Sequence, residues 1–215
     1  PGGKVNGDQI TVDVDHFTKY AVFAVNQAPV VPVDTGSKLT DIAGHWAEGD
    51  IRAALKAGIV HGYEDGAFRP NQFVSRAEFV VMLTNGLYPN AKPELLWTYT
   101  DAGSIGDWAK QGIALAAKSK LVQGYEDGSF RPADQLTRAQ LAVVLANALG
   151  AAPSGSVSYA DAADIPAWAL DAVGIVTKAE LMQGYDENRF APLGTVTRAE
   201  AITVINRLLQ KQTQK

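Results

Sequence analysis

Hydrophobic residues recur along this chain with the spacing of short amphipathic helices. Ala47, Ile51 and Leu55 fall on one face of a helix, and charged residues occupy the opposite face. Further along, the segment 141–146 is apolar on nearly every side, which predicts a buried helix. The alternation of these two patterns along the chain predicts repeated units of a helix, a loop and a second helix.

The loop between the two helices carries a repeated motif. Gly62–Pro70 returns with one change as Gly124–Pro132, and in a more altered form as Gly184–Pro192. In every copy a tryptophan and an arginine flank the loop at a separation of 30 residues: Trp46 and Arg76, Trp108 and Arg138, Trp168 and Arg198. A spacing that is kept in three copies indicates three tandem units of one supersecondary structure.

Turn and capping residues set the limits of the expected helices. Asp-Gly at 65–66 and 127–128 predicts tight turns, and Asn188 can adopt the left-handed conformation in the third copy. Each second helix opens with a capping box, formed by Ser75 and Glu78, Thr137 and Gln140, and Thr197 and Glu200. Because one unit cannot cover its own apolar face, we expect the second helices to pack on one another inside the first helices and loops.

The start of the chain has a different pattern. Ile10–Asp15 alternates in polarity, and Tyr20–Val25 is rich in residues that favour strands. Residues 1–27 are therefore interpreted as the end of a preceding β domain, and 28–38 as a linker. The three units are expected to be 39–92, 93–152 and 153–215.

Composition excludes several classes of function. The 215 residues carry a formal net charge of −4 without a clustered basic stripe, so nucleic acid is not an expected partner. The absence of cysteine excludes disulfides, thiolate zinc sites and cysteine nucleophiles. No apolar run approaches the roughly 20 residues of a membrane span, so no membrane insertion is expected.

The arginine at the start of each second helix is the leading candidate for binding chemistry. A cation at this position faces the positive end of the helix dipole, which is unfavourable by about 0.3–1 kcal/mol. Arg76, Arg138 and Arg198 repeat the placement, which points to an anion. Free helix N–H groups beside a guanidinium would suit a carboxylate or phosphate. The alternative is a salt bridge to a neighbouring acidic residue, such as Asp41, Asp101 or Asp161.

Other repeated residues are candidates for the wall of a site. Trp46, Trp108 and Trp168 are interpreted as core or groove wall, with stacking on a sugar as the alternative. The loop glycines suit special backbone angles or a close approach: Gly62, Gly124 and Gly184. The side chains of Gln123 and Gln183 are candidates for hydrogen bonds to a ligand.

Catalysis, metals and cofactors are not expected. Glu78 and Glu200 suggest the carboxylate pair of a glycoside hydrolase, but the capping box accounts for both. Gln140 keeps the box without acid function. The histidines have no metal-ligand spacing, and no nucleophile or phosphate-loop motif is present.

Taken together, the tryptophan, the Gly-Tyr-x-Asp-Gly-x-Phe-Arg-Pro loop and the Thr-Arg-Ala-Glu helix start resemble the S-layer homology (SLH) family, from about Leu39 to Leu209. The resemblance implies a mainly α fold, with three repeats in a pseudo-threefold trefoil around a central three-helix bundle. It also implies a non-catalytic, extracellular anchor in the Gram-positive cell wall or S-layer.

The resemblance also supplies the expected ligand. In the family, grooves between neighbouring repeats hold peptidoglycan-linked secondary cell-wall polysaccharide, and the motif arginine engages the carboxylate of pyruvylated N-acetylmannosamine. That role would fall on Arg76, Arg138 and Arg198 of a monomeric chain. The alternatives are a helical repeat that binds a protein or itself, and a wall hydrolase.

Departures from the motif predict that the three grooves differ. Gln140 removes a negative charge beside a proposed anion site, and Ala191 stands where the other loops have Arg69 and Arg131. The approach to the tryptophan is also two residues longer in the second and third copies than in the first.

Overall fold

The computed structural model describes residues 4–6, 9–11, 39–92, 94, 99–152 and 157–213. Near the start, β1 (Lys4–Asn6) pairs antiparallel with β2 (Gln9–Thr11). The expected strand over Ile10–Asp15 is therefore confirmed only at its beginning, and β1 was not predicted. The predicted strand Tyr20–Val25 and the linker 28–38 lie outside the described residues.

Three helix–loop–helix units follow, as the repeats predict. The first helices of the units are α1 (Glu48–Lys56), α3 (Asp107–Lys118) and α5 (Leu170–Lys178). The second helices are α2 (Arg76–Leu87), α4 (Arg138–Leu149) and α6 (Arg198–Thr213). Short 3₁₀ turns accompany them in the second and third units: η1 (Ala102–Ser104), η2 (Ala162–Asp164), η3 (Ala167–Ala169) and η4 (Asp186–Asn188). None of the helices in these described ranges is both long and apolar enough to cross a membrane.

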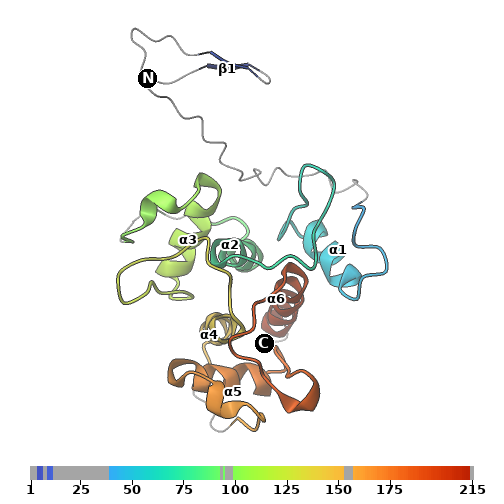
Figure 1. Ribbon diagram of the computed structural model, residues 1–215, viewed down its shortest axis with the longest axis vertical. Helices are drawn as coiled ribbons and strands as arrows, with labels where there is room; N and C mark the ends of the chain where they lie inside the picture. The colour runs from blue at the N-terminus through green and yellow to red at the C-terminus, as the bar shows by residue number, and fades with distance from the viewer. Residues whose placement is uncertain are drawn as a thin grey trace.

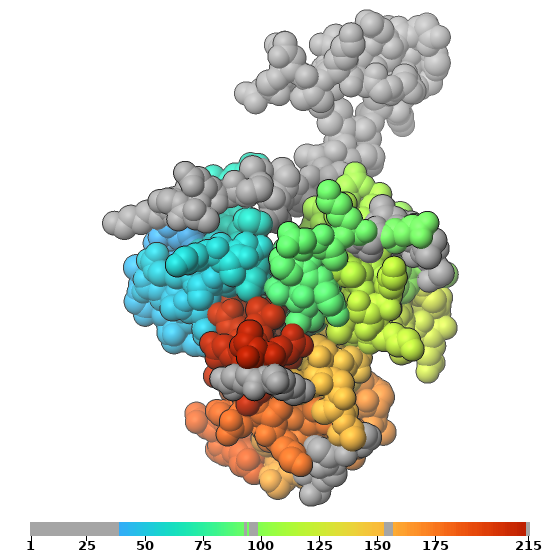
Figure 2. All heavy atoms as spheres, turned by 180° about the vertical axis from the view of Figure 1, so that it is seen from behind, coloured from blue at the N-terminus to red at the C-terminus, as the bar shows by residue number. Residues whose placement is uncertain are grey.

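The second helices occupy the centre of the structure. Figure 1 shows α2, α4 and α6 seen nearly end-on, with α1, α3 and α5 outside them. Each second helix packs on the first helix of another unit: α2 on α3, α4 on α5, and α6 on α1. α2 also packs on α6. From behind, the end of α6, in red, reaches the surface between the first unit in cyan and the third in orange (Figure 2). The apolar character of the second helices therefore reflects burial, as predicted.

A ring of three backbone hydrogen bonds joins the units at the starts of the second helices. The Val74 N–H donates to the Val196 carbonyl (2.9 Å), the Val196 N–H to the Leu136 carbonyl (2.9 Å), and the Leu136 N–H to the Val74 carbonyl (3.1 Å). The side chains of all three residues are buried. Each residue precedes the N-cap of its helix, so the ring fixes the three helix starts relative to one another.

The predicted capping boxes are confirmed. The Ser75 and Thr137 side chains accept from the N–H three residues later, and Glu78 and Gln140 accept from the N-cap N–H. In the third unit the Glu200 carboxylate accepts from the Thr197 N–H (2.8 Å), and the Thr197 hydroxyl accepts from the Glu200 N–H (3.3 Å). The box therefore holds equally with Gln or Glu at its third position.

The contact that closes the chain, between α6 and α1, is polar. The Asp50 carboxylate accepts from the Thr203 hydroxyl (2.8 Å) and from the Asn206 amide (3.1 Å). In the second unit the position of Asp50 is held by Gly112, where an added Cβ would lie 2.9 Å from Thr84 Oγ1. At this position α6 and α1 are therefore joined by side-chain hydrogen bonds, whereas α2 and α3 are closely packed.

The central position of Leu136 leads to a stability prediction. Leu136→Ala is expected to lower the free energy of unfolding by about 2–5 kcal/mol, because it leaves a cavity in the fully buried centre. Urea unfolding measures this change. The matched control is Leu193→Ala, since Leu193 is 70% exposed and its truncation should change stability by no more than about 0.5 kcal/mol. Equal effects of the two changes would contradict the central role of Leu136.

Candidate ligand-binding grooves

A cavity of about 800 Å³ opens beside Arg76. Its wall takes Arg76 from the first unit, residues 121–127 and Gln140 from the second, and Trp168 from the third. We call this cavity the Arg76 groove. The family resemblance implied grooves between neighbouring units, whereas this groove draws on all three, because Trp168, in the 3₁₀ turn η3 that packs on α4, also lines it.

The same arrangement recurs around Arg198. A cavity of about 200 Å³ is lined by Arg198 from the third unit, His61 and Glu78 from the first, and Trp108 from the second. We call it the Arg198 groove. The corresponding arginine of the second unit, Arg138, meets the loop of the third unit, and we call its surroundings the Arg138 site.

The three arginines lie buried in these positions and reach the loop of another unit. Their exposed fractions are 7% for Arg76, 6% for Arg138 and 4% for Arg198. The terminal nitrogen Nη2 of each donates to a backbone carbonyl, at Gln123 (2.6 Å), Gln183 (2.7 Å) and His61 (3.4 Å) respectively. The predicted residues Gln123 and Gln183 thus hold the arginines with their backbone carbonyls.

Each guanidinium also lies over two aromatic rings of that loop. Arg76 is 5.2 Å from the ring centre of Tyr125 and 4.8 Å from that of Phe130. Arg138 lies over Tyr185 and Phe190, and Arg198 over Tyr63 and Phe68, at 4.3–4.9 Å. Cation–π contacts of this kind orient a buried guanidinium. Our sequence reasoning missed the phenylalanines, although their recurrence in the motif was the signal.

The motif arginines of the first two loops cover the outer side of the tyrosine. Arg69 lies 4.1 Å from the centre of the Tyr63 ring, and Arg131 lies 4.0 Å from that of Tyr125. Arg131 is also paired with Asp127 (2.8 Å). Hydrogen bonds from Ser129 and Arg131 lower the pKa of the Asp127 carboxyl, so this pair is ionised at neutral pH. The third loop has Ala191 at this position, which provides no such guanidinium.

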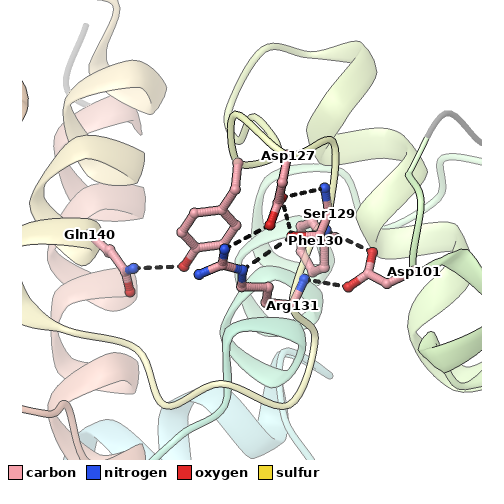
Figure 3. Close-up of polar contacts among 7 residues, drawn as sticks. Asp101, Asp127, Ser129, Phe130, Arg131 and Gln140 are labelled. Carbon is pink, nitrogen blue, oxygen red and sulfur yellow. Dashed lines mark hydrogen bonds and ion pairs between the residues drawn. The ribbon is translucent and has the colours of Figure 1, made fainter.

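The predicted aspartates support the loops from behind. Figure 3 shows Asp101 facing Phe130 and Arg131, whose N–H groups both donate to its carboxylate at 2.7 Å. Asp41 and Asp161 do the same in the other loops. Among the described residues, none of these aspartates forms an ion pair with an arginine that opens a second helix. The salt-bridge alternative is therefore wrong for these three aspartates, because backbone N–H groups occupy both carboxylate oxygens, but it is confirmed for Arg198, which pairs with Glu78 (3.5 Å).

The helix starts do not offer the free N–H groups that the sequence suggested. The Arg76 N–H donates to the Asp134 carbonyl (2.8 Å), and the Ala77 N–H donates to the Pro132 carbonyl (3.0 Å). The Glu78 N–H donates to the Ser75 hydroxyl in the capping box (3.2 Å), and the Phe79 N–H donates to the Ser75 carbonyl (3.0 Å). The same pattern holds in α4 and α6. An anion in these grooves would therefore meet the guanidinium side chain and not the helix backbone.

The three tryptophans are exposed, so the interpretation as core residues is wrong. Their exposed fractions are 64% for Trp46, 37% for Trp108 and 61% for Trp168. Trp108 and Trp168 line the Arg198 and Arg76 grooves, which agrees with the other half of that interpretation, a groove wall. Trp46 lies against the ring of His45, 5.4 Å away. Large exposed indoles beside a polar groove provide flat apolar faces.

The loop glycines are required by close approach. A Cβ on Gly124 would lie 2.8 Å from the Tyr99 ring and 2.9 Å from the Ser129 carbonyl oxygen. Gly62 and Gly184 are equally crowded. Positive φ occurs instead at Gly66 and at Gly128, in the predicted turns. Close approach, one of the two reasons expected for these glycines, is therefore confirmed. The other expected reason, a special backbone angle, applies instead to the turn glycines Gly66 and Gly128.

The grooves differ in the residue that faces the arginine. In the Arg198 groove the Glu78 carboxylate lies 3.5 Å from the guanidinium. At the Arg138 site the Tyr185 hydroxyl lies between the arginine and Glu200, accepting from Arg138 (3.3 Å) and donating to Glu200 (2.7 Å). In the Arg76 groove Gln140 is the equivalent residue, and its amide donates to the Tyr125 hydroxyl (2.8 Å), a hydrogen bond drawn in Figure 3. Gln140 thus acts beside the arginine of the preceding unit.

A second difference lies about two helical turns further along the second helix. The side-chain amides of Asn85 and Asn147 donate to the carbonyls of Ile59 and Leu121. At this position in the third unit, Arg207 donates to Leu181 (3.1 Å) and adds a cation. No group of three or more His, Asp or Glu side chains in the described ranges could hold a metal ion.

The repeated geometry corresponds to a known family. The sequence pattern of the S-layer homology domain matches residues 38–80, 98–142 and 158–202, which together make up more than half of the chain. The chain belongs to the S-layer homology domain family. SLH domains are cell-surface anchoring modules, so this chain is an extracellular module of the cell surface.

Several curated proteins contain a similar region. An amylopullulanase of Thermoanaerobacterium thermosulfurigenes is 32% identical over 98% of the chain, which covers 11% of that protein. A surface-layer 125 kDa protein of Lysinibacillus sphaericus is 27% identical over 90% of the chain and 17% of the protein. A cellulosome-anchoring protein of Acetivibrio thermocellus is 29% identical over 72% of the chain, which covers 36% of that protein. The SLH chain therefore spans only a minor part of these relatives.

The loop role of Asp161 can be tested through stability. Burial opposes ionisation of Asp161, but the N–H groups of Phe190 and Ala191 outweigh it and lower the pKa of the carboxyl. Asp161→Asn should cost about 1–3 kcal/mol at neutral pH, because an amide NH₂ replaces one acceptor. The stabilisation by Asp161 is present above the ordinary pKa of about 4 and is lost as the pH falls through the lower folded pKa.

Urea unfolding of both proteins at several pH values measures this cost. The difference between wild type and Asp161→Asn should shrink below about pH 4. Asp171→Asn, at an exposed position in the first turn of α5, is the control and should cost at most about 1 kcal/mol. A difference that stays constant down to the lowest pH would show that the carboxylate charge does not hold the loop.

Proposed function

We propose that this SLH chain retains a larger protein at the cell wall by binding acidic, pyruvylated secondary cell-wall polysaccharide in its grooves. The observation that carries the proposal is the buried arginine of each groove, which lies against an exposed loop on a rigid set of carbonyl and aromatic contacts. An exposed tryptophan from a further unit stands beside it in the Arg76 and Arg198 grooves.

The chemistry of this pair fits an acidic sugar. A guanidinium presents several donors in a plane and recognises a carboxylate by paired, charge-assisted hydrogen bonds. The aromatic contacts and backbone carbonyls fix its orientation before the ligand arrives, which reduces the entropy lost on binding. The indole offers an apolar face to the sugar ring, and the loop supplies polar groups at the rim.

The proposed role is retention without catalysis. Glu78 and Glu200 cap different helices and lie in different grooves, so they do not form the carboxylate pair of a glycoside hydrolase. Relatives named as a surface-layer protein, an amylopullulanase and a cellulosome-anchoring protein share this region. A part common to proteins of such different names fits an anchor, and linked grooves on one polymer would add avidity.

Calorimetry with the pyruvylated sugar tests the proposal. Arg76→Ala should weaken binding of pyruvylated N-acetylmannosamine at its groove by about 2–5 kcal/mol, because a charge partner of the ligand carboxylate is removed from a buried site. The sugar without pyruvate should bind weakly to both proteins. Thermal unfolding of the variant confirms that it is folded.

Arg52→Ala is the matched control for this experiment. Arg52 is an exposed arginine that pairs with Glu48 on the outer face of α1, so its loss should leave binding unchanged. Wall binding that survives the loss of Arg76, Arg138 and Arg198 would rule out carboxylate recognition. It would favour the alternative of a protein-binding or self-assembling repeat.

A further inference from the structure

Resting on the carboxylate-binding function above, we propose that the third residue of each second helix determines which groove accepts the ligand. Gln140 leaves the Arg76 groove open to a carboxylate, whereas Glu78 acts as a built-in competitor in the Arg198 groove. The Arg76 groove is then the primary site for an acidic sugar.

The Arg76 guanidinium is held by fewer protein contacts than the other two. Nε of Arg138 donates to the Phe190 carbonyl (2.7 Å), and Nε of Arg198 donates to the Phe68 carbonyl (3.1 Å). In the part of the chain that the structure describes, Nε of Arg76 is buried without a hydrogen-bond partner. A buried donor without a partner is costly, and it lies in a residue that lines the cavity. The Arg76 guanidinium is therefore held less firmly by the protein than those of Arg138 and Arg198.

Arg76 also has an unbalanced charge. Among the described residues it forms no ion pair with a carboxylate, whereas Arg198 is paired with Glu78. Burial lowers the pKa of the Arg76 guanidinium, and the nearby Tyr125, Tyr99 and Asp134 offset this only in part. A buried cation is stabilised most by an anion that enters the same cavity. A carboxylate ligand provides that anion in the Arg76 groove.

The Arg198 guanidinium already has protein partners for its hydrogen bonds and its charge. The guanidinium uses all three nitrogens, donating to Phe68 and His61 and pairing with Glu78. An incoming carboxylate would have to displace Glu78 or accept its repulsion, and like charges brought together weaken association.

The sizes of the two cavities also favour the Arg76 groove over the Arg198 groove as the primary site. The Arg76 groove has a volume of about 800 Å³, and Trp168 on its wall is 61% exposed. The Arg198 groove has a volume of about 200 Å³, and Trp108 on its wall is 37% exposed. At the Arg138 site, Glu200 reaches the arginine only through Tyr185, so we expect the affinity of this site for a carboxylate to be intermediate.

The capping box makes a clean exchange of charge possible. Glu78 accepts from the Ser75 N–H (2.7 Å), and Gln140 accepts from the Thr137 N–H (3.1 Å). Gln140→Glu and Glu78→Gln should therefore keep the helix starts and exchange the charge in the groove; at position 140 the Tyr125 hydroxyl would then donate to the carboxylate, as Tyr185 does to Glu200. The two variants are reciprocal controls in one chain.

The experiment is calorimetric titration of wild type, Gln140→Glu and Glu78→Gln with pyruvylated N-acetylmannosamine and with N-acetylmannosamine. For the pyruvylated sugar, Gln140→Glu should weaken the tightest binding event at least about tenfold. Glu78→Gln should leave that event unchanged and tighten a further, weaker one by a similar factor. The neutral sugar should not distinguish the three proteins, and thermal unfolding should be alike.

The outcomes separate this inference from the function on which it rests. If wild type binds the pyruvylated sugar and both variants bind it equally well, the competitor role of Glu78 and the ranking of the grooves are wrong, while carboxylate recognition stands. Weaker binding after Glu78→Gln would show that Glu78 contacts the sugar itself and would also overturn the inference. If wild type binds neither sugar, the proposed function fails and the inference fails with it.

Discussion

Closure of the three units around Val74, Leu136 and Val196 is the constraint on which the rest of the structure depends. Their ring of backbone hydrogen bonds places the start of each second helix against the loop of another unit. The first N–H groups of each helix are then satisfied by that loop, and not by solvent or ligand. Because the neighbouring loop covers the helix start, the side chain of an arginine at this position lies against that loop, over two of its aromatic rings. Burial of the arginines is thus a consequence of closure.

Closure also explains why the grooves belong to no single unit. A groove needs the arginine of one unit, the loop and helix of a second, and the tryptophan of a third, as in the Arg76 groove. Changes in one unit therefore act on a site whose arginine belongs to another. Gln140 alters the surroundings of Arg76, and Ala191 alters those of Arg138. Three copies of one motif can in this way produce sites of different charge within a single chain.

Local features could be predicted from the sequence, and contacts between units could not. The repeats, the capping boxes, the turns and the burial of the second helices follow from spacing and residue type within one unit. The three arginines could be predicted as candidate binding residues because a cation is unfavourable at the start of a helix. The spacing did not reveal that the loop carbonyls already occupy the helix N–H groups, nor that Asp41, Asp101 and Asp161 hold the loops. Both depend on which segments become neighbours after closure.

The central claim is that an acidic sugar binds in a groove shared by three units, and NMR titration tests it most directly. The signals to follow are the Nε–H of Arg76, the side-chain amide of Gln140 and the indole N–H of Trp168, which come from the three different units and line one cavity. Their assignment would use Arg76→Lys and Trp168→Phe. On adding pyruvylated N-acetylmannosamine, all three signals should shift along one binding curve. Shifts confined to residues of one unit, or none at these three groups, would contradict the account.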